Sequence, residues 1–203
     1  MERVRLAADL LGAPSCVGCR RRPGPLCRGC ATTVSRPPST EPLPHVARVV
    51  APWAYTDPAR ALVLGLKLDA RRPFAEPLVA AMVDEVRRRG LDAGVVTWVP
   101  GRRRDMRRRG FDHAEVLARG LSRRLGLGAR PTLRRVDARP DQTTLSGAAR
   151  RRNLRGAFAA RPCPQTVALV DDLVTTGATA SACAAALRRA GAPSVEVIAA
   201  CRA

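Results

Sequence analysis

Two adjacent carboxylates follow a short apolar run near the end of the chain. Residues 167–181 read VALVDDLVTTGATAS, so Asp171 and Asp172 come directly after VALV. A parallel α/β sheet binds its ligands beyond the carboxyl ends of its strands. If VALV is a strand and a helix begins near Ala178, both aspartates lie at the ligand-binding edge of such a sheet.

The segment after the aspartates is typical of a phosphate site. We call it the phosphate loop, and it consists of Thr175, Thr176, Gly177, Ala178 and Thr179. Free N–H groups and the dipole at a helix N-terminus attract anions, and Gly177 allows close approach with a positive φ. Neighbouring carboxylates would repel a phosphate unless they hold hydroxyls or a metal ion. A sugar phosphate satisfies both demands, whereas the plainer alternative is that the aspartates cap a turn.

Four cysteines near the N-terminus have the spacing of metal ligands. They form two CxxC pairs separated by seven residues, and they are Cys16, Cys19, Cys27 and Cys30. Four thiolates suit tetrahedral Zn²⁺ in a closed structural site, and an iron–sulfur cluster is the alternative. The other cysteines lack such spacing and are expected to be small buried apolar residues. They are Cys163, Cys183 and Cys201.

The composition indicates one domain, or a core domain with a small appendage. The chain has 203 residues, of which 46% are hydrophobic. It contains no run of about 20 apolar residues, which a membrane span requires, so we expect no membrane insertion. The first 15 residues are too short and too charged for a signal peptide. These features predict a cytoplasmic protein.

The net charge of +19, from 36 basic and 17 acidic residues, favours a polyanionic partner or substrate. A solvated basic surface would give the same charge. Lys67 is the only lysine, since every other basic residue except the histidines is arginine. Its retention indicates a role that needs a compact ammonium group rather than a planar guanidinium.

Apolar strands that alternate with helices predict a parallel α/β sheet. We expect strands over 46–55, 95–100, 167–170 and 194–200. We expect helices over 1–15, 58–68, 74–89, 112–125 and 178–190. Asp112 and Glu115 resemble a capping box at the start of one helix. An arginine-rich loop is expected at 101–111, and no element is assigned within 128–165.

Several of these motifs occur together in a known family. VALVDDLVTTGAT resembles the phosphoribosyl pyrophosphate (PRPP) motif of type I phosphoribosyltransferases, and the whole chain resembles the ComF (competence protein F) family. The four-cysteine module, Leu66-Lys67-Leu68, and Val99-Pro100 through Arg109-Gly110-Phe111 carry that resemblance. Gln142, Leu145, Arg150, Asn153 and Phe158 also match the family. Asp112 and His113 stand where the family usually has Asn-Gln, and we expect His113 to be a surface histidine at a helix start.

The resemblance implies a phosphoribosyltransferase fold with a small N-terminal zinc module. The corresponding division is 1–34 for an N-terminal helix and the zinc module, 35–45 for a proline-rich linker, and 46–203 for the phosphoribosyltransferase-like domain. PRPP with Mg²⁺ would bind Asp171, Asp172 and the phosphate loop, with Arg109 and Lys67 as further contacts. Asp171 and Asp172 would also be the catalytic residues of any transfer to an acceptor.

The family resemblance also implies a link to natural competence and DNA uptake, with a helicase or other uptake proteins as partners. The alternative to an enzyme is a non-catalytic protein that handles single-stranded DNA. The basic stretches 101–111 and 148–156 could follow a nucleic-acid backbone, although they could also be solvated loops. Aromatic residues, which stack bases, make up only 3% of the chain.

Overall fold

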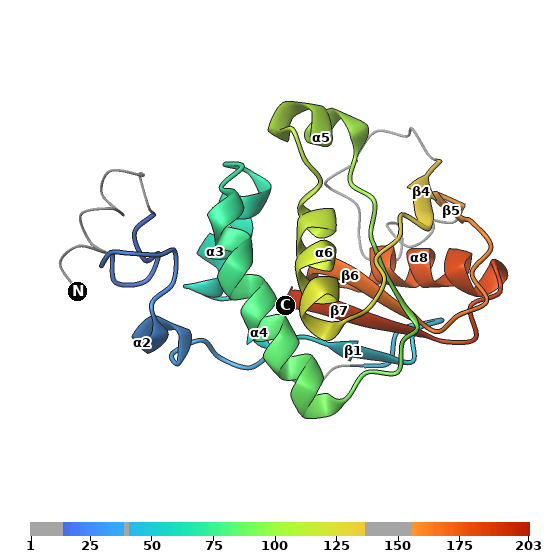
Figure 1. Ribbon diagram of the computed structural model, residues 1–203, viewed down its shortest axis with the longest axis horizontal. Coiled ribbons are helices and arrows are strands. Elements are labelled where there is room, and N and C mark those ends of the chain that lie inside the picture. Colours follow the sequence, from blue (N-terminus) through green and yellow to red (C-terminus); the bar gives the residue numbers. More distant parts are fainter. Residues whose placement is uncertain (1–13, 39–40, 137–155) are drawn as a thin grey trace.

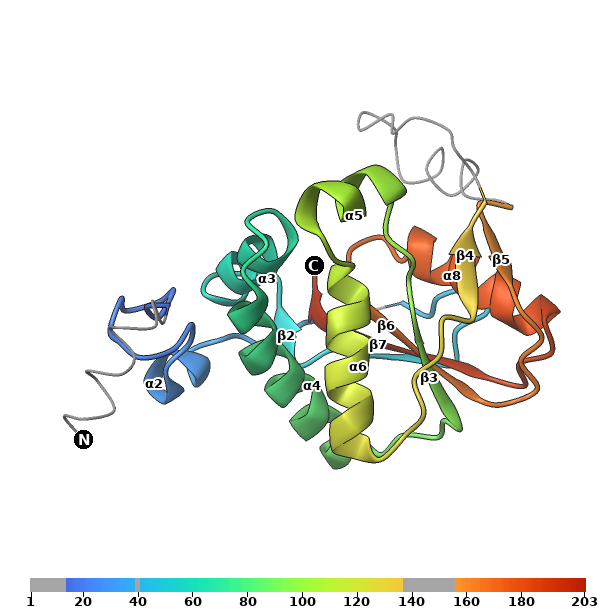
Figure 2. The same ribbon diagram turned by 45° about the horizontal axis from the view of Figure 1, so that its top comes forward.

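The computed structural model describes residues 14–38, 41–136 and 156–203. Its centre is a parallel sheet in the order β1-β7-β6-β3, and β2 also pairs with β7 (Figures 1 and 2). The strands are β1 (Arg48–Val50), β2 (Trp53–Ala54), β3 (Val95–Trp98), β6 (Val167–Val174) and β7 (Val195–Arg202). The predicted parallel α/β fold is therefore confirmed.

Helices cover both faces of the sheet, and this explains why its strands are apolar throughout. One face carries α3 (Ala59–Lys67), α4 (Ala75–Arg89) and α6 (His113–Leu125), and the other carries α8 (Ala178–Arg189) (Figure 2). Successive strand residues point to opposite faces. Accordingly, Ala168 and Val170 pack in the first core and Val167 and Leu169 in the second.

Smaller elements flank the sheet and its covering helices. The short helix α2 (Arg28–Ala31) lies in the cysteine module, and the 3₁₀ turn η1 (Arg72–Phe74) leads into α4. An antiparallel pair, β4 (Leu133–Arg135) and β5 (Phe158–Ala160), packs near α8. None of the helices in the described part of the chain is long and apolar enough to cross a bilayer.

The structure corrects several predicted boundaries. The strand expected over 46–55 is divided into β1 and β2, and the strand expected over 167–170 continues to Val174. The segment 101–111 is not a loop, because Arg103–Arg109 forms α5, which ends at Gly110 in the left-handed conformation (φ 78°). The unassigned region 128–165 supplies β4 and β5.

Some predictions fall outside the described residues. The helix expected over 1–15 falls there almost entirely, as does the basic stretch 148–156 except for its last residue. Four family matches also lie there, namely Gln142, Leu145, Arg150 and Asn153. Phe158 is described, and it is buried in β5.

Candidate functional site

Asp171 and Asp172 lie within β6 at the point where its neighbour β3 has already ended. The last β3 residue, Trp98, pairs with Val170, so the two aspartates extend past that strand. On the other side β7 still pairs with β6, with Ala199 opposite Asp171. Both aspartates are buried, with exposed fractions of 9% and 2%. Strand pairing thus brings both residues to the predicted sheet edge, although inside the strand rather than after it.

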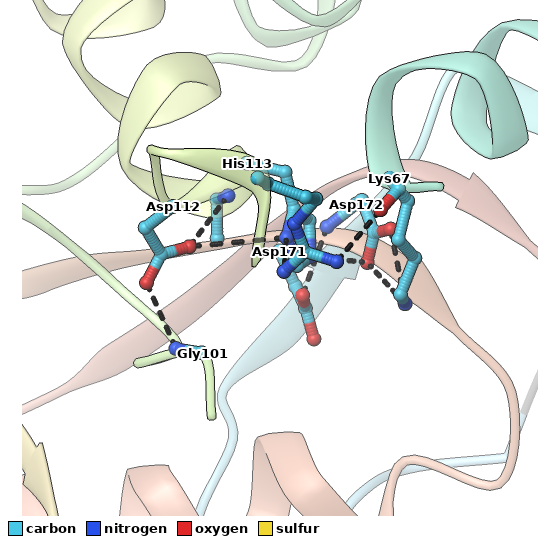
Figure 3. A network of polar contacts seen from close by, with 8 residues as sticks. Lys67, Gly101, Asp112, His113, Asp171 and Asp172 are labelled. Atoms are coloured by element: carbon cyan, nitrogen blue, oxygen red, sulfur yellow. Dashed lines mark hydrogen bonds and ion pairs between the residues drawn. The ribbon is translucent and has the colours of Figure 1, made fainter. Parts of the chain in front are cut away.

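Asp172 is the centre of a polar network that joins three elements (Figure 3). Nζ of Lys67, the last residue of α3, lies 3.2 Å from Oδ2 and 3.4 Å from Oδ1 of Asp172. Nε2 of His113, the first residue of α6, lies 3.5 Å from Oδ1. The Lys67 side chain is 39% exposed, whereas the His113 side chain is 9% exposed. The site is therefore open to solvent on the lysine side.

Arg109 links Lys67 to His113. It donates a 2.6 Å hydrogen bond from Nη1 to the Lys67 carbonyl, and its Nη2 lies 3.3 Å from Nδ1 of His113. A guanidinium group can only donate, so Nδ1 must accept. The His113 proton is then on Nε2, which faces Asp172. In this arrangement Nε2 of His113 donates to the Asp172 carboxylate.

The expectation that His113 is a surface histidine is wrong. Asp112 explains its burial, because Asp112 holds the start of α6 against the loop after β3. Its Oδ1 accepts from the Ala114 N–H at 3.0 Å, which confirms the predicted cap, and its Oδ2 accepts from the Gly101 N–H at 2.8 Å. Both carboxylate oxygens are thereby engaged. The unusual Asp-His pair was the sequence signal that could have identified this role.

The two aspartates have opposite pKa shifts. Burial, reinforced by the negative charge of Asp172, raises the pKa of Asp171 well above its ordinary value. Burial also disfavours the ionised form of Asp172. The hydrogen bond with His113 and the positive charge of Lys67 outweigh this effect of burial, so the pKa of Asp172 is lowered. Asp172 therefore favours its ionised form more than an ordinary aspartate does, and Asp171 favours its protonated form more. The carboxylate Oδ1 of Asp171 accepts from the Asp172 N–H at 2.9 Å.

The phosphate loop encloses a cavity of about 70 Å³ together with Asp171 and residues 173, 174 and 180. The helix α8 begins at Ala178, directly after Gly177, as predicted. Gly177 has φ 69°, and a Cβ atom there would lie 2.4 Å from the Leu43 side chain. Glycine is thus required twice, by its backbone conformation and by a close neighbour. That neighbour is a leucine from the proline-rich segment, which the sequence did not indicate.

The structure also separates the arginines of α5. Arg109 turns inward, while Arg103, Arg104, Arg107 and Arg108 are exposed. One side of α5 thus faces Lys67 and His113, and its exposed side carries several positive charges. Arg109 is thus the arginine of this segment that contacts the Asp172 network in the described residues.

The four module cysteines converge on one point, since their sulfur atoms all lie within 4.8 Å of one another. Cys16 accepts from the Cys27 N–H at 3.3 Å, and Cys27 accepts from the Cys30 N–H at 3.5 Å. Burial raises the pKa of Cys16, but backbone hydrogen bonds, with that of Cys19 largest, lower it to about 6. The neighbouring thiols, Cys27 foremost, raise the pKa of Cys30 to about 12, and a hydrogen bond from the Cys30 backbone lowers the pKa of Cys27. Four converging sulfur atoms with amide donors fit a tetrahedral zinc ion.

The remaining three cysteines are buried in the core as predicted, at 5%, 0% and 0% exposure for Cys163, Cys183 and Cys201. The cysteine module is not isolated from that core. Its Val17 and Leu26 pack against the cluster that contains α3.

Comparison with known proteins places this chain in a family. It matches no protein-family model. It is 35% identical to competence protein F of Haemophilus influenzae over 96 residues, which are 44% of this chain and 42% of that protein. It is 33% identical to DNA utilization protein YhgH of Salmonella typhi over 181 residues, which are 85% of this chain and 77% of that protein. The chain belongs to the ComF family.

Solved structures resemble this ComF protein over part of its length. The match to a glutamine PRPP amidotransferase from Bacillus subtilis covers 62% of this chain and 26% of the amidotransferase chain, at 24% identity and a TM-score of 0.43. The match to TT1426 from Thermus thermophilus covers 64% of this chain and 83% of the TT1426 chain, at 21% identity and a TM-score of 0.39.

Proposed function

We propose that this ComF protein binds PRPP, or a related ribose phosphate, with Mg²⁺. The observation that supports the proposal most is the position of Asp171 and Asp172 beside the phosphate loop. The cavity of about 70 Å³ in that loop would take the 5-phosphate, and Asp171 lines it. The vicinal ribose hydroxyls would then face the aspartates, whose carboxyl oxygens can accept hydrogen bonds from them.

Lys67 and Arg109 would contact the pyrophosphate group of the ligand. Both are cations, and both lie on the Asp172 side of the site. Ionised donors form short, strong hydrogen bonds with phosphate oxygens. Lys67 would exchange its contact with Asp172 for one with the ligand. Mg²⁺ would neutralise pyrophosphate charge and suits carboxylate and phosphate oxygens.

Comparison of ribose 5-phosphate with 2-deoxyribose 5-phosphate tests the proposed orientation by calorimetry. We expect the wild type to bind the deoxy sugar about tenfold more weakly, because it loses a hydrogen bond to a charged group. An Asp171→Asn/Asp172→Asn variant should bind both sugars with equal, low affinity. Equal binding of both sugars by the wild type would refute the role of the aspartates.

Transfer of the phosphoribosyl group to an acceptor is the catalytic form of this proposal. The bond from C1 of ribose to the pyrophosphate oxygen would break, a bond from C1 to the acceptor would form, and the pyrophosphate would leave. Asp171 and Asp172 are the only acidic groups that we assign to the reacting centre. Release of pyrophosphate from PRPP in the presence of candidate bases and amines tests whether turnover occurs.

A second function, binding of single-stranded DNA without catalysis, is supported by charge and by the names of the relatives. The relatives are named for DNA utilization and for competence, and this chain carries a net charge of +19 with exposed arginines on α5. Partners would then include a helicase or other uptake proteins. The apparent affinity for a single-stranded oligonucleotide should fall steeply with salt, and a flat response would exclude this electrostatic mode.

We further propose a structural zinc ion on Cys16, Cys19, Cys27 and Cys30, and the division of the chain at 1–34, 35–45 and 46–203. Zinc would hold the module together and take no part in chemistry, because all four ligands come from the protein.

None of the described cysteines forms a disulfide bond, so all of them are free thiols. Free thiols suit a reducing compartment, and we propose that the protein acts in the cytoplasm.

A further inference from the structure

A second and larger cavity lies beside the edge strand β1. Its volume is about 450 Å³, and one wall is the proline-rich segment. Its lining includes the apolar residues Pro37, Pro42, Leu43 and Val49 and the charged residues Glu41 and Arg202. It shares no lining residue with the cavity of the phosphate loop. It is therefore separate from the proposed PRPP site.

Arg202, the last residue of β7, brings a buried positive charge to this cavity. The residue is 7% exposed, and within residues 14–38, 41–136 and 156–203 its Nε has no hydrogen-bond partner. Its Nη2 donates to the backbone carbonyl of Glu41 at 3.5 Å, and the described residues provide no carboxylate within ion-pair distance. Burial lowers the pKa of this guanidinium, with no compensating negative charge.

The other arginines that line the cavity each have a carboxylate partner. Arg48 lies 2.8 Å from the Glu196 carboxylate and also donates to the carbonyls of Arg89 and Gly90. Arg89 lies 2.6 Å from Glu85. Arg202 is different, because a buried charge without a counterion carries an uncompensated desolvation cost. An anion in the cavity would remove that cost.

The walls around Arg202 indicate the shape of the anion. Proline, leucine and valine residues line part of the cavity, although polar atoms make up more of its accessible wall than apolar atoms do. Its volume of 450 Å³ is more than six times that of the cavity in the phosphate loop. A ligand that carries both an apolar body and a charged group suits such a mixed wall. We infer that this cavity binds a small organic anion, whose carboxylate or phosphate contacts Arg202 and whose apolar body packs on the prolines.

Calorimetry with three ring compounds tests this inference. Benzoate and phenyl phosphate carry the two head groups, and benzamide is the neutral analogue. We expect at least one anion to bind about tenfold more tightly than benzamide. Preference between the anions distinguishes a carboxylate ligand from a phosphate ligand. Equal binding of all three, or binding of none, would overturn the inference.

Variants locate the bound anion. Arg202→Met should lose the preference for the anion and, because it removes an unpaired buried charge, should not lower the melting temperature. Arg202→Lys should also bind more weakly, since it lacks the planar fork. The exposed Arg123→Met is the matched control and should bind as the wild type does. Anion binding that is unchanged in both Arg202 variants would refute the site.

Two further variants test the charge inside the cavity and distinguish this site from the one that contains Asp172. Glu41→Gln removes the carboxylate that lines the cavity, so anion affinity should rise. Asp172→Asn should not change it, because Asp172 belongs to the other site. Loss of binding in Asp172→Asn but not in Arg202→Met would assign the anion to the phosphate loop instead. Failure of PRPP binding would leave the result for Arg202 unaffected.

Discussion

The ammonium group of Lys67 lies 3.2 Å from the carboxylate of Asp172, across 105 positions of sequence. The only lysine of the chain thus pairs with one of the two aspartates proposed to hold the ribose. Burial lowers the pKa of Lys67, but the charge of Asp172, followed by that of Asp171, raises it above its ordinary value. Lys67 is therefore a fixed positive charge at the entrance of the site.

Replacement of Lys67 by methionine should weaken PRPP binding about tenfold or more, because it removes one charge-assisted contact with the pyrophosphate. Arg60→Met, an exposed change on the same helix, is the control and should bind as the wild type does. Dissociation constants from calorimetry check this prediction. Tighter PRPP binding by Lys67→Met would show that the lysine merely occupies the site and must be displaced.

His113 should act on the ligand through Asp172. Removal of its Nε2 donor in His113→Ala should raise the pKa of Asp172 and weaken PRPP binding several-fold. His113→Gln retains an N–H donor and should lie between the wild type and the alanine variant. The pKa can be followed by ¹³C NMR of the aspartate carboxyl carbons. The control is His45→Asn, at the exposed second histidine, where asparagine tolerates the φ of 65°. An unchanged Asp172 pKa in His113→Ala would argue against this role.

The opposite pKa shifts of the two aspartates predict opposite pH effects on stability. An unfolded aspartate titrates near pH ~3.9. The folded pKa of Asp172 is lowered, so its contribution is present above pH ~4 and is lost as the pH falls. The folded pKa of Asp171 is raised, so the folded state loses stability as the pH rises above ~4, because the unfolded aspartate ionises there while the folded one still holds its proton.

Urea unfolding across a pH series checks these signs. The stability deficit of Asp172→Asn relative to the wild type should shrink below pH ~4. Asp171→Asn should gain stability relative to the wild type as the pH rises, since asparagine need not ionise. Curves that run parallel to the wild type at every pH would contradict the opposite pKa shifts of the two aspartates.

The cysteine module should carry one zinc ion per chain. Cys16→Ser should lower the zinc content and the melting temperature, because a structural zinc site contributes directly to folding. The pKa of Cys16 is about 6, so zinc should dissociate more readily as the pH falls through that region. Cys201→Ala lies outside the cluster and should retain full zinc. Stoichiometric iron instead of zinc in fresh protein would favour the iron–sulfur alternative.

Local patterns predicted most of this fold. The apolar run of β6, the cap at Asp112 and the helix start at Ala178 were all readable, because each depends on neighbouring residues. The helix α5 was not, because a run of arginines indicates exposure rather than conformation. The end of β6 at Val174 depends on pairing with β7, which no local pattern reveals.

The candidate site also has parts that the sequence predicted and parts that it did not. The aspartates and the phosphate loop were recognisable because one continuous segment contains them. The pairing of Lys67 with Asp172, the burial of His113 and the contact of Leu43 with Gly177 join distant segments, and only the packed structure brings them together. The charge on Arg202 is unremarkable in sequence, and its burial beside a cavity gives it significance.

Calorimetric titration of PRPP with Mg²⁺ tests the central proposal most directly. The wild type should bind one PRPP per chain, and the Asp171→Ala/Asp172→Ala variant should show no measurable binding while it retains its zinc and its cooperative unfolding. Absence of binding by the wild type, or equal binding by the folded double variant, would contradict the proposal.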